Sequence, residues 1–495
     1  MTKNTIYVDS AASSLKPESV IRAESDFLRH HYANAGRGVC ARAAAVDEMA
    51  EKARAAVAKF IGAARPDQIV FTGGTTDGMN RIPRILKLAG AIAPGAGVIV
   101  SDLDHHSARL PWEDAAQREK CKIVVCPLDD KYNLDIASLN CPPTDALCAS
   151  TPPKGGVIAE DRLLPPWGES QSGVSRDAVG GQNIDVFVIT AMSNVLGVPQ
   201  DVKKLVARAK KINPDAITIV DAAQYVAHLP IDVTDWGCDF LCFSGHKIGA
   251  DTGIGVMYIK NPEKWPADKL GGGMVSTVSA KPTRSQSIEH RAESIDNVGA
   301  RRDAPNNATS EWTVVPAPAK FEAGTLPLTQ IAGLGMAINE RSGGACHPSW
   351  GGLSPEGRLG GASSNKIINI KNKNLSAKAP PCQPAADTPP LRGGDATPCE
   401  LLNYLRTELS KIPRIKFVSP DGAHLLTFVV DGMHVLDFGA MIGARGVCLR
   451  VGNMCASWLH ARLGLPGTIR ISVGPWNTMV EMKEVVKVVN EIVNK

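Results

Sequence analysis

The feature that most constrains the fold of this chain is an alternation of strand-like and helix-like segments between residues 46 and 260. Short apolar runs recur, as in GVIVS (97–101), VFVIT (186–190) and ITIVD (217–221), and helix-like segments such as DVKKLVARAKKI (201–212) separate several of them. Buried strands that alternate with helices are typical of a mostly parallel sheet covered on both faces. We therefore predict an α/β fold.

A change of pattern divides the chain into two predicted domains. Residues 21–335 contain the alternation and are assigned to a large domain. Residues 1–20 and 336–495 are assigned to a smaller α+β domain, because helix-like segments such as LLNYLRTEL accompany the strand-like HLLTFVV after about residue 400. A chain of 495 residues is long enough for two or three domains.

Three stretches, 150–183, 278–312 and 342–398, interrupt this organisation. Each is rich in Gly, Pro, Ser, Ala, Asn or charged residues and has little apolar periodicity. Such a segment cannot bury enough apolar surface to order itself alone. We interpret the first two as surface insertions in the large domain and the third as one in the small domain. Their cost in loop-closure entropy is small, because it grows only logarithmically with length.

The composition argues against several classes of protein. The formal net charge is +4 and no basic stripe runs between aromatic residues, so nucleic acid is not an expected partner. No apolar run reaches the roughly 18 residues of a membrane span, and the first residues, MTKNTIYVDSAAS, lack the apolar core of a signal peptide. We expect a cytoplasmic protein with reduced thiols and no membrane association.

The twelve cysteines predict neither a disulfide framework nor a metal site. Disulfide-dense scaffolds are far shorter than this chain. Cys238 and Cys242 have a spacing that metal ligands also use, but they lie in a predicted strand and no second pair stands in suitable register. We interpret them as core residues rather than zinc ligands.

Polar groups follow several of the predicted strands. The stretch FTGGTTDGMN (71–80) places a Gly-Gly turn and two hydroxyls before a helix-like segment, where free N–H groups and the helix dipole attract an anion such as phosphate. The other groups are His105 with His106 after GVIVS, Asp221 with Gln224 after ITIVD, and Lys247 with Ser244 and His246 in FSGHK.

Together these groups match the needs of pyridoxal 5′-phosphate. The cofactor requires a lysine amine for its aldehyde, an acid for its pyridinium nitrogen and a cradle for its phosphate. Each group alone has a simpler alternative, since a Gly-Gly-Thr turn also caps helices and most lysines lie on the surface. Polar groups at four strand ends together favour the cofactor.

Ten motifs give the chain a resemblance to a known family. In chain order they are VDSAASSLKP, NAGRGV, FTGGTTDGMN, DHHSARLPW, MSNVLGVPQDV, VDAAQYVAHLPIDV, GCDFLCFSGHKIGADTGIGVMY, FEAGTLPL, LRVGNMCASWLHARLG and TIRISVG. Through them the chain resembles the cysteine desulfurases and selenocysteine lyases, and most of all the group II desulfurases, which are class V aminotransferases of fold type I. The resemblance covers nearly everything outside the three insertions.

The resemblance implies a role for each matching residue. Lys247 would be the Schiff-base lysine, Cys455 the sulfur-accepting nucleophile, and His105 a catalytic residue that stacks on the cofactor ring. Asp221 would pair with the pyridinium nitrogen and Gln224 with the phenolic oxygen. Thr75, Thr76, Ser244 and His246 would hold the phosphate, with Thr325 arriving from the other subunit of a homodimer, and Asn194, Arg470, Arg450 and Arg37 would bind substrate.

The implied reaction converts L-cysteine to L-alanine and leaves the sulfur as a persulfide on Cys455. A sulfur-acceptor protein would then take the sulfur toward iron–sulfur clusters or another sulfur-transfer pathway. Three alternatives stay open: lysis of L-selenocysteine, another class V aminotransferase reaction, and a non-catalytic scaffold, against which the complete set of residues argues. A buried core thiol is the simpler interpretation of Cys455, but its polar, glycine-bearing surroundings argue against it.

Two positions depart from the family pattern. Gly36 precedes Arg37 where these enzymes usually carry a histidine, and Asn453 and Met454 precede Cys455 where many members have one. Neither departure touches the residues assigned to the cofactor. Both bear on the substrate and on the acceptor protein.

Overall fold

The structure is a computed structural model of the chain, and it describes residues 5–36, 40–136, 184–279, 311–342 and 396–494. The predicted insertion at 150–183 lies outside these residues, as do the interiors of the other two. No helix in the described ranges is long and apolar enough to cross a membrane.

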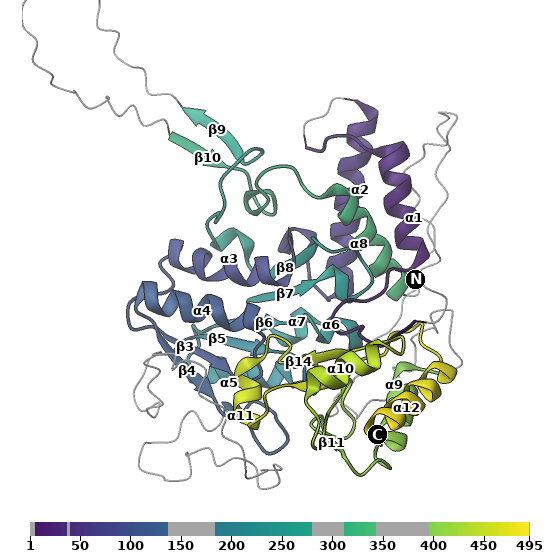
Figure 1. Ribbon diagram of the computed structural model, residues 1–495. Helices are drawn as coiled ribbons and strands as arrows, with labels where there is room; N and C mark the ends of the chain where they lie inside the picture. Colours follow the sequence, from purple (N-terminus) through teal and green to yellow (C-terminus); the bar gives the residue numbers. More distant parts are fainter. Residues whose placement is uncertain (1–4, 37–39, 137–183, 280–310, 343–395, 495) are drawn as a thin grey trace, which may run out of the picture.

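A seven-stranded sheet forms the centre of the larger part of the molecule (Figure 1). Its strands, in spatial order, are β2 (Ile69–Thr72), β8 (Gly255–Ile259), β7 (Phe240–Ser244), β6 (Ile217–Asp221), β5 (Ile184–Thr190), β3 (Gly97–Ser101) and β4 (Lys122–Cys126). The five strands from β7 to β4 pair in parallel. The α/β class is confirmed, and the strands predicted at 97–101 and 217–221 coincide with β3 and β6.

The sheet is mixed at one edge because β8 runs antiparallel to both β2 and β7. This strand was not among the predicted ones. Only residues 245–254 join β7 to β8, and a parallel connection needs a crossover of a dozen or more residues. The short connection therefore reverses the chain beside β7.

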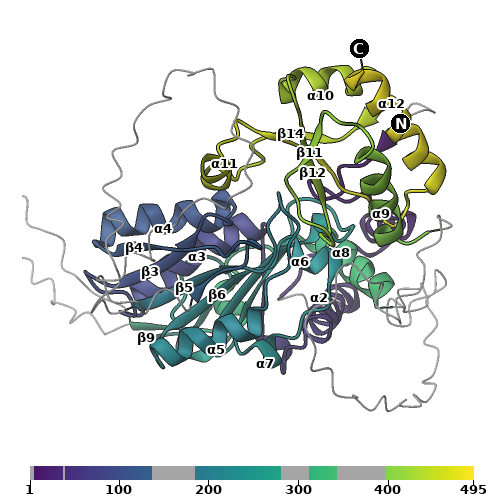
Figure 2. The same cartoon turned by 90° about the horizontal axis from the view of Figure 1, so that it is seen from below.

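Helices cover both faces of this sheet (Figures 1 and 2). Side chains along β3 show the division: Val98 and Val100 pack with one set of helices, and Ile99 packs with the other. Such alternation follows from the two-residue repeat of a strand. The first set is α3 (Thr75–Leu88) and α4 (His106–Glu119), and the second includes α1 (Glu18–Asp26), α2 (Ala41–Phe60), α5 (Val202–Ile212) and α8 (Leu328–Arg341).

A second hydrophobic core lies in an α+β unit (Figure 2). This unit lies beside the edge of the large sheet at which the parallel strands have their carboxyl ends. Its antiparallel strands, in order, are β11 (Ile415–Phe417), β12 (Leu426–Val430), β15 (Thr468–Ile471) and β14 (Arg450–Gly452), with helices α9 (Pro398–Leu409), α10 (Val435–Gly443) and α12 (Met479–Val493). The N-terminal segment joins this unit, because β1 (Ile6–Tyr7) pairs with β13 (Val447–Cys448) and Val8 is part of its core. The exact division of the chain into two domains stays a prediction.

The predicted boundaries of the second insertion are wrong by two residues at each end. Strand β9 (Val275–Ser279) pairs antiparallel with β10 (Glu311–Val314), so both edges of the stretch 278–312 are regular structure. The β-branched residues of VSTVS and EWTV suit a strand. Figure 1 shows this strand pair extending from the body of the molecule.

Cys238 and Cys242 both belong to the hydrophobic core, as predicted, but on opposite faces of the sheet. The strand assignment of Cys238 is wrong, because β7 begins two residues later at Phe240. In the ranges that the structure describes, no three His, Cys, Asp or Glu side chains gather in a way that would hold a metal ion.

A buried ion pair ties α2 to the segment that leads to Thr325. Arg54 is 2% exposed and donates two hydrogen bonds to the Glu322 carboxylate, at 2.8 and 2.9 Å, and one to the carbonyl of Ile69 at 2.8 Å. Glu322 also accepts the backbone N–H of Phe71 at 2.7 Å. The Arg54 guanidinium and the Phe71 N–H therefore both depend on the Glu322 carboxylate.

We predict that Glu322→Ala lowers the free energy of unfolding by about 3–5 kcal/mol, because it leaves the Arg54 charge buried and the Phe71 N–H unpaired. Denaturant unfolding of wild type and variant measures the difference.

Glu51→Ala is the matched control. Glu51 also bonds Arg54, at 3.1 Å, but its side chain is 62% exposed, so its loss is expected to cost less than about 1 kcal/mol. Equal losses for the two variants would contradict the assigned role of Glu322.

Candidate active site

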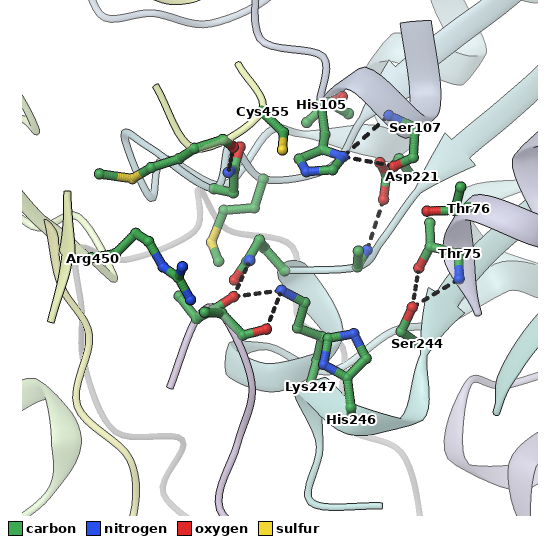
Figure 3. A pocket seen from close by; sticks show the side chains of 18 of the residues that line it. Thr75, Thr76, His105, Ser107, Asp221, Ser244, His246, Lys247, Arg450 and Cys455 are labelled. Carbon is green, nitrogen blue, oxygen red and sulfur yellow. Dashed lines mark hydrogen bonds between the residues drawn. The ribbon is translucent and has the colours of Figure 1, made fainter. Parts of the chain in front are cut away.

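A pocket of about 290 Å³ lies between the carboxyl ends of the sheet strands and the α+β unit (Figure 3). Open α/β sheets bind ligands at this edge. The large sheet supplies residues that follow β2, β3, β5, β6 and β7, and the α+β unit supplies residues of β14, β15 and the loop after β14. Side chains far apart in the sequence therefore meet here.

Most of the predicted site residues line this pocket. Thr325 does not, since it is exposed on the segment after Glu322, and Arg37 lies outside the described residues. The predicted residues that line it are Thr75, Thr76, His105, Asn194, Asp221, Gln224, Ser244, His246, Lys247, Arg450, Cys455 and Arg470.

The turn before α3 forms a cradle at one end of the pocket. The Thr75 N–H donates to Ser244 Oγ at 2.8 Å, and the two hydroxyls lie 2.8 Å apart. Strand β8 approaches this turn so closely that a Cβ on Gly255 would lie 2.5 Å from the Cα of Gly74, so position 255 requires glycine. Hydroxyls and N–H groups at the start of a 14-residue helix suit a phosphate.

Four buried polar atoms of pocket-lining residues have no hydrogen-bond partner among the described residues: Gln224 Oε1, His246 Nδ1, Asn194 Oδ1 and Arg470 Nε. Unpaired buried polar atoms are costly, and a polar ligand would relieve that cost. The amide of Gln224 is otherwise oriented by the bond from Nε2 to the Ala11 carbonyl, at 2.7 Å. The phenolic oxygen and phosphate of pyridoxal phosphate fit these positions chemically.

The carboxyl group of Asp221 lies at the end of β6 with one hydrogen bond, from the Ala223 N–H at 2.9 Å. Burial raises the pKa of Asp221 to about 6, because little water remains to solvate the charge. A cation placed against it would restore the charged form. A pyridinium N–H is such a group, so the wall of the pocket fits the cofactor at this point as well.

Lys247 ends the short turn after β7 (Gly245–Lys247), and its amine donates to the backbone carbonyls of Ala11 and Ala12. Burial and, to a smaller extent, the positive charge of Arg470 lower the pKa of Lys247 to about 8, while Asp221 acts in the opposite direction. An ordinary lysine has a pKa of about 10.4. A larger share of neutral, nucleophilic amine is therefore present near neutral pH.

His105 presents a neutral ring to the pocket. Its Nδ1 accepts the N–H of Ser107 at 3.2 Å and lies 2.7 Å from the Ser107 hydroxyl, which places the ring proton on Nε2. Burial lowers the pKa of His105 to about 4, with Lys247 adding to the effect. A neutral aromatic ring can stack on another ring without the cost of burying a charge.

Asp9 is a site residue that the sequence reasoning missed. It is 6% exposed, its Oδ1 accepts from Arg470 Nη2 at 3.0 Å, and its Oδ2 lies 2.8 Å from Arg450 Nη2. Arg470 also donates to the backbone carbonyl of Asn194 at 2.7 Å. The sequence offered one signal for it, since Asp9 is the acid in the family motif VDSAASSLKP. The resemblance assigned no role to that acid. Two arginines therefore meet at the pocket with one carboxylate between them.

Asp104 was missed as well. It is 0% exposed and accepts hydrogen bonds from the Ser101 N–H at 2.7 Å, the Ser101 hydroxyl at 2.8 Å and the Thr190 hydroxyl at 2.6 Å. Burial raises its pKa, and its charge contributes to the raised pKa of Asp221. In the sequence, Asp104 could have been recognised as a site residue only by its position directly before His105.

Cys455 is exposed and lies in the loop between β14 and α11 (Ser457–Leu463), so a core interpretation of this thiol is wrong. Met454 and Cys455 both adopt left-handed backbone conformations, with φ of 51° and 56°. Asn453 stabilises the turn by accepting the Cys455 N–H on its Oδ1 at 3.2 Å. In Figure 3, Cys455 and His105 lie on one side of the pocket, and Lys247 and Ser244 lie on the other.

The other departure from the family pattern, Gly36, also has a local structural role. Its φ is 90°, a conformation that favours glycine, and its N–H donates to Asp47 Oδ1 at 2.6 Å. A histidine at this position would adopt that backbone at a cost.

Comparison with known proteins identifies similar folds and sequences. The model of the aminotransferase class-V family matches residues 6–142, 175–300 and 395–485. Cysteine desulfurases of Pectobacterium carotovorum and Salmonella agona are each 28% identical over 483 residues, which are 97% of this chain and 91% of the relative.

Two solved structures have the same fold. The cysteine desulfurase CsdA of Escherichia coli superposes with a TM-score of 0.68 at 25% identity, covering 100% of this chain and 96% of that one. An apo cysteine desulfurase of Thermococcus onnurineus superposes with a TM-score of 0.69 at 24% identity, covering 99% and 95%. The predicted fold type and the resemblance to this family are confirmed.

We predict that the Lys247 amine of the cofactor-free protein titrates with a midpoint near pH 8. Its acetylation rate should rise with pH up to about 8 and level off above, because only the neutral amine reacts. Competitive acetylation followed by mass spectrometry measures this, with the exposed lysines as internal reference.

The variant Asp221→Asn tests how the charge of Asp221 contributes to the pKa of Lys247. Asp221 favours the charged amine, so the variant should move the midpoint to lower pH. A midpoint near 10.4, the ordinary lysine value, would contradict the burial of this amine.

Proposed function

The chain belongs to the class V aminotransferase family, and from that premise we propose that it is a pyridoxal-phosphate-dependent cysteine desulfurase that converts L-cysteine to L-alanine. One observation carries the proposal: a buried lysine amine, a buried carboxyl group, a phosphate cradle and an exposed thiol line one pocket. The first three suit the cofactor, and the fourth suits sulfur transfer.

Each cofactor contact that we propose rests on a residue of the pocket wall. Lys247 would bond the aldehyde carbon, Asp221 would pair with the ring nitrogen, and Gln224 would bond the phenolic oxygen. The ring of His105 would stack on the cofactor ring. Thr75, Thr76, Ser244 and His246 would hold the phosphate. When bound, the cofactor supplies an electron sink that makes the substrate Cα–H bond acidic.

Proton transfer at the substrate Cα would be the task of Lys247. A group that both takes and returns a proton works best when its pKa is near the working pH. The lowered pKa of this amine, about 8, meets that condition better than an ordinary lysine. The carbonyls of Ala11 and Ala12 hold Nζ in the pocket by accepting hydrogen bonds from it.

Substrate orientation would fall to the two arginines and Asn194. Arg470 is 2% exposed, and its Nε has no partner among the described residues. A guanidinium can bind a carboxylate through two parallel N–H groups. We propose that the carboxylate of the substrate cysteine binds Arg470, and that the hydrogen bond to Asp9 orients the Arg470 guanidinium. Arg450, on β14, would form the side of the substrate site next to Asp9.

Sulfur transfer would be the task of Cys455. Its thiolate forms an S–S bond with the substrate sulfur, and the substrate Cβ–S bond breaks. The products are L-alanine and a persulfide, so the substrate carbon is reduced, the sulfur pair is oxidised, and no outside oxidant is needed. His105 carries its ring proton on Nε2 on the same side of the pocket.

The partners that we propose follow from what is exposed. Cys455 is exposed, so an acceptor protein can reach a persulfide on it and carry the sulfur to iron–sulfur clusters or another sulfur-transfer pathway. Thr325 is exposed and does not line the pocket of its own chain, which suits a residue that completes the pocket of a second subunit in a homodimer. A cytoplasmic location stays our expectation from the sequence.

We predict that Lys247→Ala abolishes covalent attachment of the cofactor, because the only amine that we place at the aldehyde is removed. The purified wild type should be yellow, and reduction with borohydride should fix the cofactor on the peptide that contains Lys247. Attachment to a different lysine, or an unchanged absorption spectrum in the variant, would refute the assignment.

We predict that Cys455→Ser still binds pyridoxal phosphate but forms alanine from cysteine at least about a hundredfold more slowly, because a hydroxyl is a poor nucleophile toward sulfur. Alanine production measures the rate, and mass spectrometry after brief exposure to cysteine should find one added sulfur on Cys455.

Cys448→Ser is the matched control, since Cys448 is also exposed but does not line the pocket. Its rate should equal that of the wild type. Persulfide on Cys448, or full turnover by Cys455→Ser, would favour selenocysteine lysis or another class V reaction instead.

A further inference from the structure

The loop that carries Cys455 rests against the first turn of α4, the helix that follows His105. The backbone N–H of His106 donates to the carbonyl of Cys455 at 2.9 Å. Farther along, the Arg109 guanidinium lies 4.5 Å from the ring centre of Trp458, and Arg462 lies 3.6 Å from Asp102. Three contacts therefore join α4 and the segment that precedes it to the loop and to α11.

The side chain of His106 holds the end of this loop. Its Nε2 accepts a hydrogen bond from the Ser457 N–H at 3.2 Å and lies 3.0 Å from the Ser457 hydroxyl. Its ring packs edge to face on the Trp458 ring, with 5.4 Å between the ring centres. Ser457 is the first residue of α11, and the residue before it, Ala456, has no side chain that could cap the helix. His106 thus supplies from α4 the cap that α11 lacks.

The loop needs such support from outside. Left-handed conformations at two consecutive residues other than glycine persist only where the surroundings over-determine them. Met454 is held on one side, because its carbonyl accepts from Asn194 Nδ2 at 2.7 Å. Cys455 is held on the other side by the His106 N–H, and the following Ser457 by the His106 ring.

The chemical state of His106 agrees with this role. Burial lowers the pKa of His106, so the ring is neutral near pH 7 and Nε2 keeps the lone pair that accepts the Ser457 N–H. The proton of that tautomer lies on Nδ1. A protonated ring would donate from both nitrogens and lose the bond.

We propose that His106 is a positioning residue that holds the Cys455 loop in register with His105. The two histidines are consecutive, so the turn that presents the His105 ring to the pocket also fixes the Cys455 carbonyl and the start of α11. This inference rests on the proposed desulfurase function and adds the residue that aims its thiol.

The test is His106→Ala in the cofactor-loaded protein. The rate of persulfide formation on Cys455 in a single turnover, and kcat for alanine, should fall by about tenfold to a hundredfold, because misplacement of a reacting group by 1 Å can cost that much. KM for cysteine and the cofactor absorption should change little, since Arg470, Asp9 and Lys247 are not touched.

His106→Gln separates positioning from general damage. The side-chain oxygen of glutamine can accept the Ser457 N–H in place of Nε2, so this variant should recover most of the lost rate. His30→Ala is the control, because His30 is an exposed histidine that does not line the pocket, and its kcat should equal that of the wild type.

Hydrogen exchange gives a second readout that does not depend on activity. In His106→Ala, peptides that cover 453–463 should lose protection while those of β6 and β7 keep theirs. This measurement still applies if the wild type forms no alanine from cysteine. That result would refute the proposed function but not the role of His106 in holding the Cys455 loop.

Either of two results would overturn the inference. One is unchanged exchange in 453–463 together with unchanged kcat in His106→Ala. The other is loss of the cofactor band in His106→Ala with no recovery in His106→Gln, because His106 would then support the fold of the pocket and not the position of Cys455.

Discussion

The buried guanidinium of Arg470 joins the three parts of the chain that build the pocket. It lies on β15 of the α+β unit, pairs with Asp9 of the N-terminal segment and donates to the Asn194 carbonyl in the loop after β5. A buried charge is tolerated only when it is paired and hydrogen-bonded, so these segments can pack closely only in this arrangement. The position of the α+β unit over the sheet, and with it the position of Cys455, depends on that requirement.

Burial also sets the protonation of the groups around the pocket. It lowers the pKa of Lys247 and of the pocket histidines and raises the pKa of Asp221. Each shift has the same cause, which is that a charged form loses water on entering the pocket. A cofactor that brings a pyridinium proton and a phosphate supplies the missing partners, so the same burial that disfavours these charges in the free protein favours binding. Polar atoms without partners, such as Gln224 Oε1, point to the same conclusion.

The thiol of Cys455 differs from the rest of the site in its exposure and in its backbone conformation. Cys455 is exposed and lies in a strained turn, whereas Asp221 and Arg470 are buried in regular strands. This difference agrees with the function that we propose, in which the cofactor needs rigid groups around it and the acceptor protein must be able to reach the thiol. Asn453 suits this turn, since its side chain accepts the Cys455 N–H and donates to the Ser457 hydroxyl. The loop thus has its own hydrogen bonds although it lacks the histidine that many relatives carry.

The sequence by itself determined that the apolar runs GVIVS, VFVIT and ITIVD become strands, and which residue types follow them. GVIVS and ITIVD are strands to the residue, and Asp221 and Lys247 stand at strand ends, because apolar runs and the polar residues that end them are local properties. The family motifs added Cys455, Arg470 and Asn194. The local pattern did not predict strand β8, and its antiparallel direction follows only once β8 is known to pair with β7 across the short connection 245–254.

Only the tertiary structure decided the contacts between distant segments. Asp9 and Arg470 are separated by 461 positions, and His106 and Ser457 by 351, so no periodicity or spacing relates them. The Asp9–Arg470 pair forms because the sheet, the N-terminal segment and the α+β unit bury their apolar faces together, and a buried polar group must then be paired with a group of the segment beside it. The His106–Ser457 pair is exposed and forms because the same packing places α4 beside α11.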